Sequence, residues 1–214
     1  MNKLFILNTV ELNDKNIFEY CFNKMPEERK EKILNFHFEK DKKLSLGAGV
    51  LLYEGLKDFG VNSKEIMYNK NDKPYLKNNE IFFNISHSEN IVICAFSDKE
   101  VGVDVEKINH FEKDVINRVF LENEINDSQN KDIFYTKLWT SKESLMKYLG
   151  TGLSLDPKAI QFDLKKNECI RCDELNDKRF YFTQYEIEDY SVSVCSEYKS
   201  FTNELIWRNL RWTI

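Results

Sequence analysis

Hydrophobic residues recur at helical spacing in three stretches of the chain, and each stretch carries a signal for one of its ends. Pro26, followed by two glutamates, indicates a helix that begins there and continues through Leu34. Two more helices are predicted over residues 44–59, before Gly60, and over residues 133–149, before Gly150.

Five further runs have the alternating or continuous apolar pattern of β-strands. They cover residues 81–86, 91–96, 101–106, 180–185 and 190–195. Polar turns at 87–90 and 186–189 would fold the first two and the last two runs into antiparallel hairpins. The strands therefore accompany the helices in both halves of the chain.

The order of a long helix followed by a hairpin occurs twice, which indicates an internal duplication. We predict an α+β fold of two similar lobes related by pseudo-twofold symmetry, with the active site in the cleft between them. The N-terminal lobe would span residues 1–100 and the C-terminal lobe residues 101–214. The length of 214 residues suits two such lobes of roughly 100 residues each, and the absence of a Gly/Ser-rich linker predicts that they are closely joined.

Composition and charge exclude several classes of protein. The chain is 42% hydrophobic and 31% charged, which excludes a disordered chain. Its net charge of −5 provides no overall basic footprint for a nucleic acid. The longest apolar stretch is far short of the roughly 20 residues of a spanning helix, and the first residues resemble no secretory leader. We expect a cytoplasmic protein without a membrane or nucleic-acid partner.

The five cysteines are odd in number and scattered along the chain, which favours free thiols over a disulfide framework. Cys169 and Cys172 form a CxxC motif, but no second pair and no neighbouring histidines accompany it. The sequence therefore disfavours a zinc site and a redox site at this motif.

Asp104 and Glu106 are candidate metal ligands. Alternation along the strand would place both on one face, opposite the valines of residues 101–105. Paired carboxylates suit Mg²⁺, which takes oxygen ligands and is usually completed by substrate phosphates. The alternative is that these acids lie on a solvated strand face.

The helix over residues 133–149 carries a second candidate group. At 100° per residue, its leucines 138, 145 and 149 form a core stripe, whereas Trp139, Glu143 and Lys147 share another face. Glu143 could be a third metal ligand or a general base, with Lys147 directed at a phosphate. The alternative is an exposed Glu–Lys pair four residues apart, which contributes a few tenths of a kcal/mol.

A third candidate group could donate hydrogen bonds to phosphate oxygens. It combines Lys73, at a turn before Pro74, with Ser86 and His87 near a hairpin tip. Direct activation of Ser86 by His87 is disfavoured, because adjacent strand residues point to opposite sides.

Taken together, these motifs resemble those of a known family. Residues 102–106 (GVDVE) followed by residues 139–147 (WTSKESLMK) resemble the paired signatures of the 4′-phosphopantetheinyl transferases. Lys73-Pro74 and residues 83–88 (FNISHS) resemble the surfactin-synthetase-activating type, which is two-lobed and monomeric.

The resemblance implies the contents of the cleft between the lobes. Asp104, Glu106 and Glu143 would hold Mg²⁺, for which Mn²⁺ could substitute, on the pyrophosphate of coenzyme A. The implied coenzyme A contacts are Arg29, Lys32, Ser45, Lys73, Pro74, Ser86, His87 and Lys147. A basic helix over residues 29–43 would face the 3′-phosphate.

The implied reaction transfers 4′-phosphopantetheine from coenzyme A to a serine hydroxyl of an apo acyl- or peptidyl-carrier protein and releases 3′,5′-ADP. Glu143, or a water that it orients, would accept the serine proton, and Lys147 would meet the charge on the leaving group. We expect a monomer, and we expect the carrier protein to dock on residues 109–132 through Phe111, Val119 and Phe120.

Two rival functions use the same residues. A metal-dependent phosphohydrolase would use the carboxylates to activate water against a phosphoanhydride, without any carrier protein. A non-catalytic module would bind a carrier protein or a nucleotide, and its carboxylates would be solvated.

Overall fold

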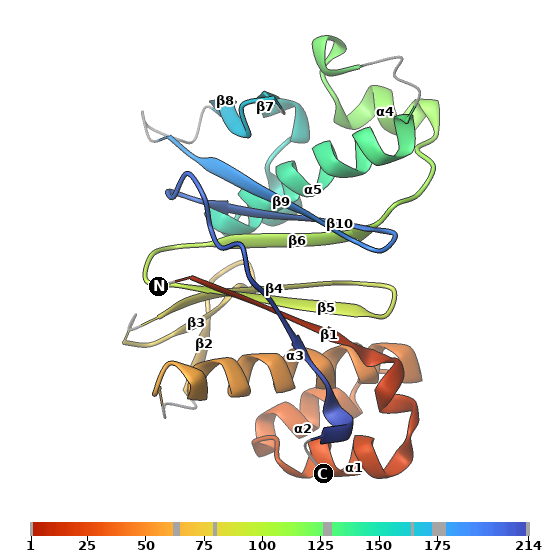
Figure 1. Cartoon of the computed structure of the whole chain (residues 1–214), viewed down its shortest axis with the longest axis vertical. Helices are drawn as coiled ribbons and strands as arrows, with labels where there is room; N and C mark the ends of the chain where they lie inside the picture. Colours follow the sequence, from red (N-terminus) through yellow and green to blue (C-terminus); the bar gives the residue numbers. More distant parts are fainter. Residues whose placement is uncertain are drawn as a thin grey trace.

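The computed structural model describes residues 2–61, 65–78, 81–125, 130–163, 165–172 and 179–212. The chain forms four layers, in which two β-sheets face each other and helices cover both outer faces (Figure 1). This arrangement is a mixed α+β fold, as the sequence predicts.

Each of the two large sheets contains one of the predicted hairpins. The first sheet has the order β11-β1-β5-β4, with bounds Leu205–Arg208, Lys3–Asn8, Ile91–Ser97 and Phe82–Ser88. The second has the order β6-β10-β9-β8-β7, with bounds Gly102–Lys107, Tyr190–Ser196, Tyr181–Ile187, Glu168–Cys172 and Ile160–Asp163. A separate small sheet pairs β2 (Ile66–Tyr68) with β3 (Pro74–Leu76).

The two large sheets pack against each other through aliphatic side chains. Leu4 and Ile6 of β1 meet Val103 of β6 and Val192 of β10, and all four are fully buried. The predicted alternation along β6 is therefore confirmed: its valines face the first sheet, and Asp104 lies on the opposite face. That opposite face of β6 packs on the helix α5 (Lys131–Leu149).

Helices cover the outer face of each sheet. On the first sheet lies α3, with α1 and α2 outside it, and on the second lies α5, with α4 outside it (Figure 1). The bounds are Lys15–Asn23 for α1, Glu27–Leu34 for α2, Glu39–Asp58 for α3, Lys113–Val119 for α4 and Lys131–Leu149 for α5. Short 3₁₀ helices occupy Thr9–Asn13, Glu122–Glu124, Gly152–Ser154, Pro157–Ala159 and Leu210–Trp212. No helix among the described residues is long and apolar enough to cross a membrane.

Two glycines have a defined role in the placement of α5. Gly150 ends the helix in the left-handed conformation, with φ 67°. Gly102 lies directly under the helix, where a Cβ atom would come within 2.0 Å of the Ser144 carbonyl oxygen. The missing side chain therefore allows α5 to approach β6 closely.

Two sequence predictions are wrong in detail. The basic helix expected over residues 29–43 is two helices, since α2 ends at Leu34 and α3 begins at Glu39. The turns expected at 87–90 and 186–189 are each only two residues long, because β4 continues to Ser88 and β9 continues to Ile187. Glu89 adopts a positive φ of 50°, which a tight two-residue turn requires.

The last described strand returns to the first sheet. There β11 lies parallel to β1, with Leu205 opposite Leu4, although the predicted division at residue 100 assigns it to the second lobe. The lobe boundary itself stays a prediction, but the chain crosses between the two sheets a second time after β10.

Candidate active site

Three carboxylates meet where β6 packs against α5. Asp104 and Glu106 come from alternate positions of β6, and Glu143 comes from the facing side of α5. One ligand oxygen of each lies within 4.8 Å of the others. Asp104 is only 1% exposed, so the alternative of a solvated strand face is wrong for this residue.

The ammonium of Lys147 lies among these carboxylates. Its Nζ is 2.5 Å from Asp104 Oδ1 and 2.7 Å from Ser86 Oγ, whereas the nearest Glu143 oxygen is 3.7 Å away. The pair with Glu143 therefore exists, but Asp104 is the closer partner. The Ser86 hydroxyl also donates to Asp104 Oδ1 over 2.8 Å, so this single oxygen accepts from two donors.

The charges in this cluster shift the pKa values of its members. Burial and the neighbouring Asp104 carboxylate raise the pKa of Glu143 to about 7. The pKa of Glu106 is raised by the same two causes. Burial alone would lower the pKa of Lys147, but the Asp104 and Glu143 carboxylates raise it above its ordinary value. The site thus concentrates negative charge and favours a cation.

The donor set fits a hard divalent metal ion. Asp104 Oδ2 is buried without a hydrogen-bond partner, although its twin oxygen has two. An unpartnered buried carboxylate oxygen costs free energy unless a ligand contacts it. With Glu106 and Glu143 beside it, this oxygen forms a group that could bind a metal ion preferring carboxylate ligands, such as Mg²⁺ or Mn²⁺.

A pocket of about 350 Å³ gathers most of the predicted coenzyme A contacts. The pocket lies among α2, α3 and the strands β3 and β4. Five of the predicted contacts line it: Arg29, Lys32, Ser45, Pro74 and His87. Arg29 Nη2 donates to the Ser45 carbonyl oxygen over 2.5 Å. Arg29 Nε and Ser45 Oγ are buried without hydrogen-bond partners, so the pocket contains two unsatisfied donors.

His87 connects this pocket to the carboxylate cluster. Partial desolvation and the Lys147 ammonium lower the pKa of the imidazole, so the neutral form is favoured. His87 lines the pocket, whereas Ser86, its neighbour on β4, contacts Asp104 and Lys147. Consecutive strand residues thus face the two parts of the candidate site.

Lys73 has partners within the chain. Its Nζ contacts the Glu100 carboxylate and donates to the carbonyl oxygens of Tyr148 at 3.0 Å and Val101 at 3.5 Å. Lys73 itself does not line the pocket with Arg29, whereas its neighbours Asp72 and Pro74 do. Contact between the Lys73 ammonium and a phosphate stays a prediction that would require these bonds to be broken.

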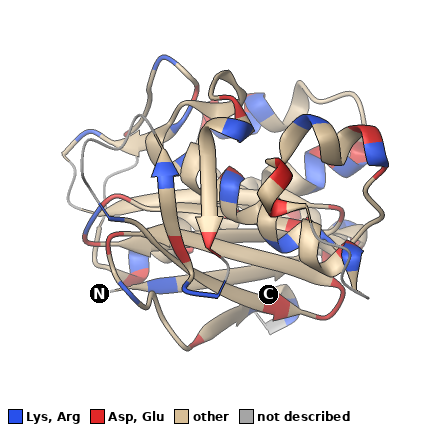
Figure 2. Ribbon diagram, turned by 90° about the horizontal axis from the view of Figure 1, so that it is seen from above, with Lys and Arg blue, Asp and Glu red and all other residues tan. Residues whose placement is uncertain are grey.

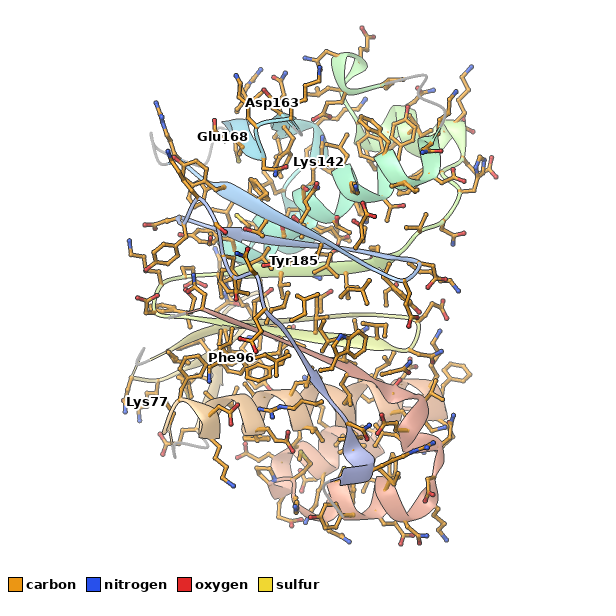
Figure 3. The ribbon with its side chains drawn as sticks, in the orientation of Figure 1. Lys77, Phe96, Lys142, Asp163, Glu168 and Tyr185 are labelled. Carbon is orange, nitrogen blue, oxygen red and sulfur yellow. The ribbon has the colours of Figure 1, made fainter. Side chains whose placement is uncertain are left out.

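The sequence reasoning missed a buried lysine beside the metal-ligand candidate. Lys142, labelled in Figure 3, is fully buried, and its Nζ is 2.6 Å from Glu124 Oε2. The same ammonium donates to the carbonyl oxygens of Pro157 and Ile160 at 3.0 and 2.9 Å. These bonds fasten α5 to the segments 122–124 and 157–160, and the next residue, Glu143, lies on a helix face about 100° away.

Two other sequence predictions concern the same lobe. Phe120 is 1% exposed and stacks on Tyr135, so the expectation that it contacts a carrier protein is wrong. Residues 126–129 of the predicted docking region lie outside the described part of the chain. Burial raises the pKa of the Cys169 thiol to about 12, so the neutral thiol is favoured without a metal.

Charges over the rest of the ribbon are mixed. Figure 2 shows basic and acidic residues interspersed over the ribbon. The dense acidic cluster at β6 and α5 is thus a local feature.

Comparison with known proteins defines the class. A family model described as the 4′-phosphopantetheinyl transferase superfamily matches residues 100–195, and one described as 4′-phosphopantetheinyl transferase, N-terminal, matches residues 13–100. The first match includes all three carboxylates, and the second includes the pocket residues.

Curated relatives bear the same name. A 4′-phosphopantetheinyl transferase of Aneurinibacillus migulanus is 30% identical, over 89% of this chain and 84% of the relative. The enzyme Sfp of Bacillus subtilis (strain 168) is 29% identical, over 83% of this chain and 84% of the relative. An L-aminoadipate-semialdehyde dehydrogenase-phosphopantetheinyl transferase of Candida glabrata is 28% identical, over 78% and 72%.

The chain therefore belongs to the 4′-phosphopantetheinyl transferase family. It is an enzyme of the Sfp type, and its reaction is the transfer of phosphopantetheine to carrier proteins.

Proposed function

We propose that this enzyme transfers the 4′-phosphopantetheine group of coenzyme A to a serine of an apo acyl- or peptidyl-carrier protein, with Mg²⁺ at Asp104, Glu106 and Glu143. The observation that carries the proposal is the cluster of three carboxylates, with one buried Asp104 oxygen left unpartnered. Bound there, Mg²⁺ would offset the charge of the pyrophosphate.

The residues of the chain would supply the proton transfer. The serine oxygen attacks the β-phosphorus, the phosphoanhydride bond breaks, and 3′,5′-ADP leaves with the electron pair of that bond. The serine proton passes to the Glu143 carboxylate or to a water that Glu143 orients. In the metal-free site the pKa of Glu143 is raised to about 7, and a carboxylate with a raised pKa suits a general base near neutral pH.

Lys147 would act on the leaving phosphate. It lies 2.5 Å from Asp104 Oδ1, so its ammonium already occupies the cluster, within reach of the place where charge develops. Its raised pKa keeps it charged throughout the reaction. Ser86 holds both Lys147 and Asp104, so the serine would maintain the spacing between the cation and the carboxylate.

The nucleotide end of coenzyme A would occupy the pocket beside α2 and α3. Arg29 and Lys32 provide positive charge there, and Ser45 Oγ and Arg29 Nε are donors without partners. The neutral imidazole of His87 would donate one hydrogen bond from the side nearest the carboxylates.

A duplication would account for the two-lobed arrangement and for a monomeric enzyme. The hairpins β4–β5 and β9–β10 each have two seven-residue strands and a two-residue turn. The first turn residues, Glu89 and Glu188, have φ angles of 50° and 51°. Helices of 20 and 19 residues, α3 and α5, precede them. These matches support pseudo-twofold symmetry with the site between the lobes.

The carrier protein would approach beside α4. A pocket of about 360 Å³ joins Glu106 to Phe111, Val115 and Trp139, so a serine entering there would reach the carboxylates. Val115 is 44% exposed and Phe111 is partly buried. These two, together with Val119, would replace the buried Phe120 as the apolar contacts of the docking region over residues 109–132.

Intact mass spectrometry tests the proposed function. Apo carrier protein, coenzyme A and Mg²⁺ are incubated with the enzyme, beside an EDTA control and the Glu143→Gln variant. A phosphopantetheine-sized mass gain that requires both the metal and Glu143 is expected. Consumption of coenzyme A without modification of several carriers would contradict the proposal and favour a phosphohydrolase, and neither change would favour a binding module.

A further inference from the structure

Strand β4 presents polar side chains at alternate positions toward β6. The two strands are edge strands of different sheets and share no backbone ladder. Side chains connect them instead: Asn84 Oδ1 accepts from the Val103 N–H over 2.9 Å, and Ser86 Oγ donates to Asp104 over 2.8 Å. The third contact is from Ser88 Oγ to Glu106 Oε2, over 2.9 Å.

The bond from Ser88 has a fixed direction. Ser88 Oγ also accepts a hydrogen bond from the backbone N–H of Lys107, over 3.2 Å. Because that N–H can only donate, the hydroxyl proton is available for the Glu106 carboxylate. The Ser88 hydroxyl of β4 is therefore anchored by the Lys107 N–H of β6 and donates its proton to the Glu106 carboxylate.

Ser86 and Ser88 differ in what else they contact. Ser86 Oγ is 2.7 Å from the Lys147 ammonium, so it belongs to the catalytic cluster already described. The Ser88 hydroxyl bonds only to Glu106 and to the Lys107 backbone, and no other donor bonds to the Glu106 carboxylate among the described residues. The position of the Glu106 carboxylate thus depends on this one hydroxyl.

We infer that Ser88 is a positioning residue that orients Glu106 for metal binding and favours Mg²⁺ over larger cations. The inference rests on the proposed function, which makes Glu106 a metal ligand. A glutamate has three rotatable side-chain bonds, and a hydrogen bond to one oxygen restricts where the other lies. Hydrogen-bond partners of metal ligands typically change metal affinity 10–100-fold when they are removed.

Selectivity follows from the coordination each ion requires. Mg²⁺ demands near-ideal octahedral geometry with short bonds, whereas Ca²⁺ accepts six to eight oxygens in flexible arrangements. A Glu106 carboxylate released from Ser88 would therefore disturb Mg²⁺ binding more than Ca²⁺ binding. A merely structural role for Ser88 would change the affinities of both ions equally or not at all.

The test measures metal binding by the whole enzyme without substrates. Free Mn²⁺ is followed by electron paramagnetic resonance, and Mg²⁺ and Ca²⁺ compete for the site. Ser88→Ala removes the donor, Ser88→Thr keeps it, and Ser196→Ala is a matched control, because Ser196 is a buried strand serine bonded to Tyr198 rather than to a carboxylate. Thermal melting verifies that each variant folds.

We expect Ser88→Ala to weaken Mg²⁺ binding about tenfold and Ca²⁺ binding by less, whereas Ser88→Thr and Ser196→Ala stay within about twofold of the wild type. Equal Mg²⁺ affinity in wild type and Ser88→Ala would overturn the inference and leave the proposed function intact. Absence of metal binding to the wild type would overturn the metal site itself. If Ser88→Ala does not fold, Ser88→Cys, which has a weaker donor, must show the same preferential loss of Mg²⁺.

Discussion

Protons and metal ions should compete for Glu143. The carboxylate is 19% exposed and lies beside Asp104 and Glu106, and its pKa is raised to about 7 by burial and these like charges. A metal ion binds the ionised form, so protonation of Glu143 must weaken metal binding. The perturbation to apply is therefore a change of pH across neutrality, in the wild type and in Glu143→Gln.

The size of the effect follows from the pKa. With a pKa of about 7, the carboxylate is about 10% ionised at pH 6 and about 90% ionised at pH 8. The apparent metal affinity should then fall roughly tenfold between pH 8 and pH 6, equivalent to about 1.4 kcal/mol. Glu143→Gln should bind metal more weakly at pH 8 and should show little change with pH in this window.

The same shift has a consequence for stability. In the folded protein the pKa of Glu143 lies above its ordinary value of 4.5, so the protonated carboxyl stabilises the metal-free fold at pH values below 4.5. The contribution is lost as the pH rises through 7. Between pH 5 and pH 8, the melting temperature of the metal-free wild type should therefore fall relative to that of Glu143→Gln. Added Mg²⁺ should restore the melting temperature of the wild type.

The assay is titration of the apo enzyme with Mn²⁺ at pH 6, 7 and 8, with thermal melts under the same conditions. Glu39→Gln is the matched control, because the Glu39 side chain is 69% exposed and pairs only with Lys42 among the described contacts. A metal affinity that does not change with pH in the wild type, or that changes equally in Glu143→Gln, would refute the assignment of this titration to Glu143.

Two further substitutions test the packing that supports the site. Gly102→Ala should cost about 1–3 kcal/mol of stability and weaken metal binding, because the new Cβ would meet the Ser144 carbonyl oxygen at 2.0 Å and force α5 away from β6. Urea unfolding and Mn²⁺ titration measure both effects, and wild-type values for both would contradict the close approach. Lys142→Met should cost about 3–5 kcal/mol, because it leaves the buried Glu124 carboxylate without its cation. Urea unfolding should show less loss in Lys142→Met/Glu124→Gln, and an equal or larger loss there would refute this reading.

Much of the fold could be predicted because helix and strand periods are local properties. The phase of α5 follows from its leucines, two of which, Leu138 and Leu145, are fully buried, and this phase places Glu143 and Lys147 together. The alternation of β6 likewise separates Asp104 from the valines. Both patterns depend only on residues within a few positions of each other.

The remaining features depend on contacts between distant segments. Lys142 is buried because loops at 119–124 and 157–160 supply its oxygens, and lysine as a residue type is ordinarily exposed. Lys73 likewise bonds to groups distant in the sequence, the Glu100 carboxylate and the Tyr148 carbonyl near the end of α5. The break between α2 and α3 spans Asn35–Phe38 without a glycine or proline to mark it. The alternate polar positions of residues 83–88 were the available signal for Ser88.

The return of β11 to the first sheet affects how the enzyme can be synthesised. On a ribosome, β1 emerges early, but its neighbour β11 emerges only after the whole catalytic half of the chain. Until then β1 has one open edge, which is a template for pairing with another chain. Deleting residues 205–212 should therefore yield a product that aggregates, even though the carboxylates and the coenzyme A pocket lie entirely upstream.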